Sequence, residues 1–208
     1  GSVWSSPVFK FVVKWIACSE IMPGAMKTHT FLSRVVVNGL FISCLALWSP
    51  QPWADQNDPQ LDRLFSALLG ADDLAHGSRI TGEIWQRWRQ VDDPAIEDLL
   101  ASGIAAMNAH DLGLALDSFH QVIEKAPEFA EGWNKRATVH YLMGNFDSSV
   151  ADIRKTLTLE PRHFGALSGM GLIYDALGNS AAAVKVWEKA LEINPHMAGI
   201  RHRIEEIR

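Results

Sequence analysis

The spacing of three prolines constrains the fold of this chain more than any other feature of its sequence. Pro127, Pro161 and Pro195 lie 34 residues apart, twice in succession, and each follows an apolar helix end. Proline ends a helix because it lacks an amide hydrogen and its ring clashes with the preceding turn. A fixed period of this length is typical of stacked helical units, since one unit alone cannot bury its apolar face. The period therefore predicts an all-α chain built from antiparallel helix pairs.

Small and large residues recur at matching positions within this period. A small residue in the first helix of each unit faces a small residue in the second helix, which lets the two backbones approach closely. A large residue further along the second helix then fills the space between consecutive units. The small residues are Gly103, Ala137 and Gly171 in the first helices and Ala115, Ser149 and Ala183 in the second, and the large ones are Phe119, Ile153 and Trp187.

With these residues in place, the units resemble the tetratricopeptide repeat family. The middle copy carries the resemblance through Trp133, Ala137, Gly144 and Phe146. The first copy is less typical, because it has His110 where the others have a turn glycine. The resemblance implies an α-solenoid, a right-handed superhelix with three full repeats at residues 96–129, 130–163 and 164–197.

Two further helical segments flank the repeats. Residues 55–95 carry apolar residues at helical spacing and predict a degenerate hairpin. We expect this hairpin to act as an N-terminal cap on the first repeat, because a bare repeat end exposes its apolar face. Residues 198–208 place Ile200, Ile204 and Ile207 on one face, which predicts a C-terminal capping helix.

The segment before the hairpin has the pattern of a secretory signal peptide, over residues 26–54. Lys27 and Arg34 supply a basic region, residues 35–48 are mostly apolar, and two prolines precede the small residue Ala54. We expect cleavage after Ala54 and a periplasmic or secreted protein.

Two alternatives for this segment remain open. Residues 35–48 could be an uncleaved membrane anchor, although the run is shorter than the ~20 apolar residues that span a bilayer comfortably. A lipoprotein cut before Cys44 is the other alternative. Residues 1–25 precede Met26 and are interpreted as an upstream extension, either an artificial addition or a misassigned start.

The sequence carries no recognisable catalytic or metal-binding motif. Gly169 and Gly171 do not continue into a phosphate-binding loop and lie in a predicted helix. The histidines show no i, i+4 pair with the glutamate that zinc enzymes use. We therefore expect no enzyme activity, no catalytic residue, no cofactor and no metal. The net charge of −5 argues against nucleic acid as a partner.

Arg136 stands where the family usually has leucine. A buried guanidinium must be paired, and Asp152 lies on the facing helix of the same hairpin. The sequence therefore predicts a structural ion pair between Arg136 and Asp152. His140, at a position where the family often has tyrosine, is interpreted as an interface residue with a satisfied ring nitrogen. His163 is interpreted as a contact at a helix end.

The resemblance also implies a binding surface, because the first helix of each pair lines the concave side of the superhelix. In the family this groove holds an extended peptide or a partner's helix. Chaperone-binding members grip a terminal carboxylate there, but Leu100 and Ile104 stand at two of those positions, so that clamp is not expected. The predicted partner-binding residues are Leu100, Ile104, Met107, Glu131, Asn134, Thr138, Tyr141, Ser168, Leu172 and Asp175.

The leading hypothesis is an exported interaction scaffold or adaptor whose partner is another protein or peptide. Membrane contact is expected only if the N-terminal segment is retained. Two alternatives are open. The apolar groove residues of the first repeat could pack under the N-terminal hairpin and be unavailable. The protein could also be an enzyme or small-ligand binder with a pocket between that hairpin and the first repeat.

Overall fold

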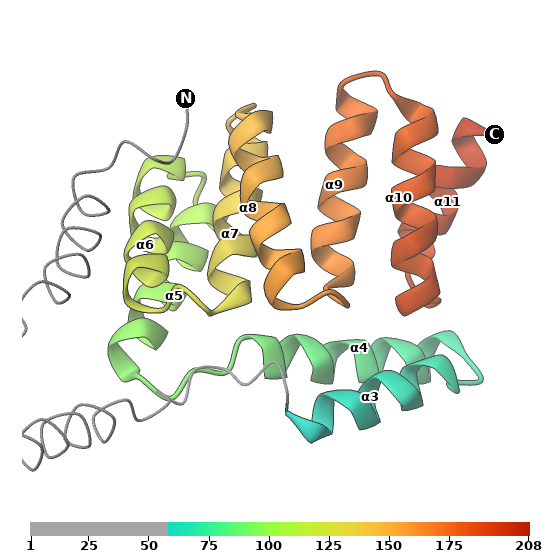
Figure 1. The fold of residues 1–208 in the computed structure, drawn as a ribbon, viewed down its shortest axis with the longest axis horizontal. Coiled ribbons are helices and arrows are strands. Elements are labelled where there is room, and N and C mark those ends of the chain that lie inside the picture. Colours follow the sequence, from blue (N-terminus) through green and yellow to red (C-terminus); the bar gives the residue numbers. More distant parts are fainter. Residues whose placement is uncertain (1–57) are drawn as a thin grey trace, which may run out of the picture. The chain divides into compact units, whose positions relative to one another are not determined.

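The computed structural model describes residues 58–208, and every regular element in that range is a helix. The all-α prediction is confirmed. The expectations for residues 1–54, including the signal peptide, lie outside the described residues. The helices are α3 (Pro59–Leu69), α4 (Leu74–Trp88), α5 (Pro94–Asn108), α6 (Leu112–Lys125), α7 (Ala130–Leu142), α8 (Phe146–Leu159), α9 (Phe164–Ala176), α10 (Ser180–Ile193) and α11 (Ala198–Ile207) (Figure 1).

Helices α5 to α10 form three antiparallel pairs that stand side by side in chain order (Figure 1). The second helix of each pair packs against the first helix of the next, α6 on α7 and α8 on α9. The turns inside the second and third pairs use Gly144 and Gly178, both at φ 75°. His110 adopts φ 60° in the first pair, a conformation that costs a non-glycine residue about 1 kcal/mol.

The small and large residues pack on each other within a pair, which differs from the expectation that the large residues fill the space between units. A Cβ atom added to Gly103 would lie 2.6 Å from Phe119 Cε1. One added to Gly171 would lie 2.2 Å from Trp187 Nε1. Contacts this short are not tolerated between packed atoms, so the two glycines are what allows the aromatic rings to lie against the first helix.

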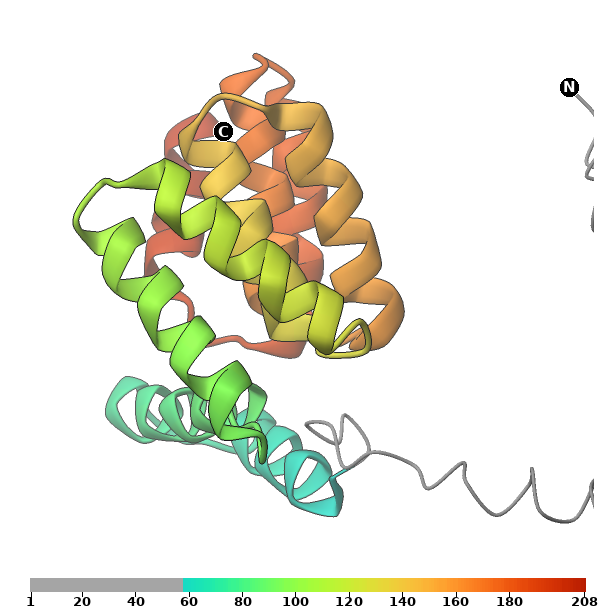
Figure 2. The same ribbon diagram turned by 90° about the vertical axis from the view of Figure 1, so that its left-hand side faces the viewer.

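The hairpin α3–α4 forms as predicted, but it does not cover the first repeat. It runs beneath the lower ends of the later repeat helices in Figure 1 and lies below the repeats in Figure 2, and α4 residues line a hollow together with residues of α7, α9 and the segment after α10. Its buried residues share a core with Phe164, and Ile193 and Met197 pack at the edge of that core. The expected position is wrong because the two tryptophans of α4 pack on the start of the third repeat. Trp88 stacks on His163 and lies tilted against Phe164, and Trp85 meets both rings edge-on.

At the other end, α11 covers the last pair. Ile204 is 4% exposed and shares a core with Ala183 and Trp187 of α10. Ile200 and Ile207 pack at the edge of the same core. The last apolar face of the solenoid is therefore covered by the capping helix that the sequence predicts.

Candidate functional site

A groove lies between the first helices of the second and third repeats, α7 and α9. It consists of two adjoining hollows that share Asn134, Thr138, Gly165 and Ser168 as lining residues. The hollow bounded by Tyr141 and Leu172, here called the upper hollow, has a volume of about 160 Å³. The hollow beside α4, here called the lower hollow, has a volume of about 380 Å³. The other residues of the upper hollow are Ala137, Tyr141, Ser149, Ile153, Gly169 and Leu172.

Half of the predicted binding residues line this groove. They come from α7 and α9: Asn134, Thr138, Tyr141, Ser168 and Leu172. Two predicted acidic residues do not offer free charges to it. Asp175 accepts hydrogen bonds from Arg203 of α11, at 3.2 Å from Nε and 2.7 Å from Nη2, and Glu131 is only 1% exposed.

The predicted residues of the first repeat are in a different situation. Leu100 is 4% exposed and belongs to the core of the first repeat. Ile104 and Met107 are half-buried and pack against that same core. The prediction that Leu100 faces a partner is therefore wrong, and the three residues are held by their own repeat rather than by the N-terminal hairpin.

Glu131 is the centre of a buried polar network beneath the groove. Asn134 Nδ2 donates to its Oε2 at 2.8 Å, and Lys135 Nζ lies 3.1 Å from its Oε1. Burial alone would raise the pKa of Glu131. The hydrogen bond from His163 and the charge of Lys135 outweigh this effect, so the pKa lies below its ordinary value. Glu131 is thus an ionised structural residue.

His163 joins this network to the hairpin. Its Nδ1 accepts the backbone N–H of Ala166 at 3.0 Å, which caps the start of α9. The ring proton therefore lies on Nε2, which donates to Glu131 Oε2 at 3.2 Å. The imidazole also stacks on Trp88, with the ring centroids 4.1 Å apart and the planes at 9°. One residue thereby connects the second repeat, the third repeat and α4.

Replacing Glu131 with glutamine is expected to make the free energy of unfolding less dependent on pH in acid. A folded-state pKa below the ordinary value of 4.5 means that ionisation stabilises the fold above that pH. This stabilisation is lost as the pH falls through the folded-state pKa, and the variant has none to lose. Urea titrations at about pH 7 and about pH 3 should therefore show a smaller difference between wild type and E131Q at the lower pH.

The matched control is Glu192→Gln, because Glu192 is exposed on α10. This variant should keep the pH dependence of the wild type. A difference between wild type and E131Q that stays constant or widens in acid would contradict the network.

The sequence did not predict that the hairpin forms one wall of the groove. The lower hollow is walled by Ser78, Thr81 and Trp85 of α4 and by the segment that follows α10. Asn194 Nδ2 in that segment donates to Thr81 Oγ1 at 3.1 Å. The only signal was the apolar face of α4, which indicates that the helix is buried but does not say against which repeat.

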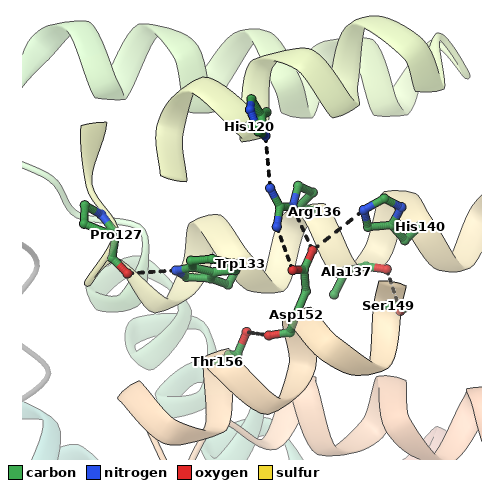
Figure 3. Close-up of polar contacts among 9 residues, drawn as sticks. All are labelled: His120, Pro127, Trp133, Arg136, Ala137, His140, Ser149, Asp152 and Thr156. Carbon is green, nitrogen blue, oxygen red and sulfur yellow. Dashed lines mark hydrogen bonds and ion pairs between the residues drawn. The ribbon is translucent and has the colours of Figure 1, made fainter. Parts of the chain in front are cut away.

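The predicted ion pair between Arg136 and Asp152 is present (Figure 3). Arg136 Nε and Nη2 donate to the two carboxylate oxygens of Asp152, each at 2.8 Å. The Nη1 atom lies 3.2 Å from His120 Nδ1 on α6, and the guanidinium lies 5.0 Å from the ring centroid of Trp133. Arg136 therefore connects three consecutive helices, α6, α7 and α8, as a structural residue.

His140 lies beside this pair. Its Nε2 is 3.9 Å from Asp152 Oδ2, while its buried Nδ1 has no hydrogen-bond partner among the described residues. The expectation of a satisfied ring nitrogen is therefore wrong, because 3.9 Å is too long for a hydrogen bond and Nδ1 has no partner within the described part of the chain. Burial, together with the charge of Arg136, lowers the pKa of His140 against the opposing effect of Asp152.

Residues 58–208 contain no group of three or more His, Cys, Asp or Glu side chains arranged to hold a metal ion. Within the same range, none of the helices combines the length and the apolar character that crossing a bilayer requires.

Comparisons with known proteins agree with this geometry. The family model for the tetratricopeptide repeat matches residues 164–197. A TPR repeat-containing protein of Rhizobium etli is 40% identical over 136 residues, which are 65% of this chain and 67% of the relative. The small glutamine-rich tetratricopeptide repeat-containing protein 2 of Mycosarcoma maydis is 29% identical over 99 residues, and the match spans 28% of its length.

Two solved structures share the fold. The first TPR of Spaghetti (RPAP3), bound to an HSP90 peptide, has a TM-score of 0.52 at 20% identity, over 56% of this chain and 93% of that one. The Arabidopsis OM64 TPR domain has a TM-score of 0.52 at 18% identity, over 55% of this chain and 95% of that one. At this identity the likeness shows the arrangement of the helices.

Proposed function

Because this chain belongs to the tetratricopeptide repeat family, we propose that it is a protein-interaction module that binds a segment of a partner protein between α7 and α9. The observation that carries the proposal is the groove itself, which is hollowed where the two helices carry small residues, Ala137 and Gly169. The RPAP3 domain holds a peptide on the same fold, which supports an interaction role for this chain as well.

The upper hollow suits one apolar side chain of such a partner. Small residues on α7 and α9 open it down to Ile153 on α8, and Tyr141 and Leu172 form its rim. Its volume of about 160 Å³ is close to the ~150 Å³ of an apolar cavity that accepts benzene. Burial of one large apolar side chain supplies about 1.5–3 kcal/mol, which is a useful anchor for a short groove.

The alternative of a small-molecule pocket is less well supported. A hollow does lie beside the hairpin, but against the second and third repeats instead of the first. It continues into the upper hollow through four shared residues, so the two form one groove. A continuous groove suits a polypeptide better than an enclosed small ligand.

Replacing Gly169 with leucine is expected to abolish partner binding without lowering stability. A Cβ atom at Gly169 meets only Ile153 Cδ1, at an ordinary 3.6 Å, so the side chain can enter the upper hollow and fill it. Removing a glycine from a helix interior stabilises a helix by about 0.5–1 kcal/mol. In-cell crosslinking of the tagged full chain, followed by mass spectrometry, should recover a partner with the wild type and lose it with G169L.

The matched control is Gly82→Leu on α4, where an added Cβ atom meets nothing within 4 Å. This variant should keep the partner while gaining similar stability. A partner retained by G169L places the interaction elsewhere, and no reproducible partner with the wild type contradicts the interaction role.

We further propose that residues 26–54 direct export to the periplasm, on the strength of their basic, apolar and small-residue regions. The mature N-terminus of the protein isolated from cells tests this proposal. A start at or near Asp55 in the soluble periplasmic fraction supports export with cleavage. A start upstream of residue 35 in the membrane fraction supports the anchored alternative instead.

A further inference from the structure

The charges around the groove are already matched within the chain. Lys135 is the one Lys, Arg, Asp or Glu among the described residues that line the two hollows. Its Nζ lies 3.1 Å from Glu131 Oε1, and it also lies over the ring of Trp85 at 5.5 Å. At the other end of α9, Asp175 is paired with Arg203. A partner therefore meets a surface without an unbalanced charge.

Several polar groups of the upper hollow are also satisfied internally. Ser149 Oγ donates to the carbonyl of Ala137 at 2.7 Å, and Thr138 Oγ1 donates to the carbonyl of Asn134 at 3.0 Å. The carbonyl of Ser168 accepts the indole N–H of Trp187 at 3.1 Å. The remaining surface comes from side chains such as Tyr141, Ile153 and Leu172, so the hollow presents apolar contact to an incoming side chain.

The lower hollow has a different character. Hydroxyl and amide side chains from α4, α7 and α9 line it, among them Ser78, Asn134 and Ser168. His196 also lines this hollow, but its Nε2 is engaged with the carbonyl oxygen of Leu68 at 3.1 Å. Asn134 Nδ2 is already engaged by Glu131. The hydroxyl groups of Ser78 and Ser168 and the side-chain oxygen of Asn134 remain to match the amide groups of a peptide backbone.

We propose that the groove selects an uncharged internal segment of its partner, anchored by one aliphatic side chain in the upper hollow, and that it does not select a charged chain terminus. The inference rests on the proposed function and names the chemistry of the partner. A terminal carboxylate would lose hydration in this groove, and the single nearby ammonium group is already engaged by Glu131. An internal segment has amides on both sides and carries no such cost.

Random peptides displayed on phage, either inside a loop or at a free C-terminus, test the inference with the full chain as bait. The loop format should be enriched, with Leu, Ile, Val or Met at one fixed position. Synthetic copies of the enriched peptides, measured by fluorescence anisotropy, should weaken roughly tenfold or more when that residue becomes alanine. Their Kd should change less than about threefold between about 50 and about 500 mM NaCl.

The controls distinguish a failure of the proposed function from a failure of the inference about the partner's chemistry. If no displayed peptide binds the wild type better than G169L, the proposed function itself fails. If peptides bind and are lost in G169L, but need a free carboxylate or weaken more than about tenfold with salt, only the uncharged internal segment is wrong. Equal binding by C-terminal acid and amide forms of the same peptide supports the inference.

Discussion

Replacing Arg136 with leucine is expected to lower the free energy of unfolding by about 3–5 kcal/mol, the usual cost of leaving a buried charge without its partner. Asp152 is 4% exposed, and the two hydrogen bonds from Arg136 are what neutralises its carboxylate. His140 is the nearest remaining cation candidate, at 3.9 Å, and burial lowers its pKa. Urea unfolding followed by circular dichroism measures the loss.

Two controls sharpen this expectation. The double variant Arg136→Leu with Asp152→Leu removes both charges, and it should return to within about 1 kcal/mol of the wild type or exceed it. Arg79→Leu makes the same substitution in an exposed pair with Glu83 on α4 and should cost less than about 1 kcal/mol. A loss for R136L as small as that for R79L would mean that Asp152 is solvated in the folded protein.

The repeats and the Arg136 pair were predictable because their determinants are local in sequence. Each copy carries its own small residue, large residue and helix-ending proline, so the packing inside a copy needs no knowledge of distant segments. Arg136 and Asp152 lie 16 residues apart on two helices of one hairpin. An unusual charge at a core position therefore pointed directly to its partner.

The position of the hairpin could not be predicted in this way. The apolar period of α4 shows which of its faces is buried, but any apolar surface satisfies that requirement. The position of the hairpin is determined by side chains that are distant in sequence, through contacts such as the stack of Trp88 on His163 and the contact of Trp85 with Gly165. These contacts join residues that no repeat relates to each other.

Only part of the groove could be predicted, because some of its lining comes from a helix that lies outside the repeats. Some positions carried over from the family line the groove as expected, among them Thr138 and Ser168. Glu131 occupies such a position but is buried, because His163 and Lys135 hold its carboxylate under the hairpin. The lower wall from α4 has no counterpart in the repeat pattern.

Replacing Trp187 with alanine is expected to cost about 3–5 kcal/mol of folding free energy. The indole is fully buried between Gly171 and the capping helix, where it shares a core with Ile204. The substitution removes this apolar contact, leaves a cavity, and removes the donor to the carbonyl of Ser168. Urea unfolding measures the loss, and α11 should become more susceptible to proteolysis because its buried residue Ile204 shares this core.

The contact between Trp187 and Gly171 also predicts a change of sign in a double-mutant cycle. With the tryptophan present, Gly171→Ala should destabilise by about 1–3 kcal/mol, because the new Cβ atom would lie 2.2 Å from Nε1 of a fully buried ring. With Trp187→Ala the space is open, and the same change should stabilise by up to about 1 kcal/mol through helix propensity. The second repeat already combines Ala137 with the smaller Ile153 at these positions. Equal destabilisation in both backgrounds would show that the ring is not what excludes a side chain from Gly171.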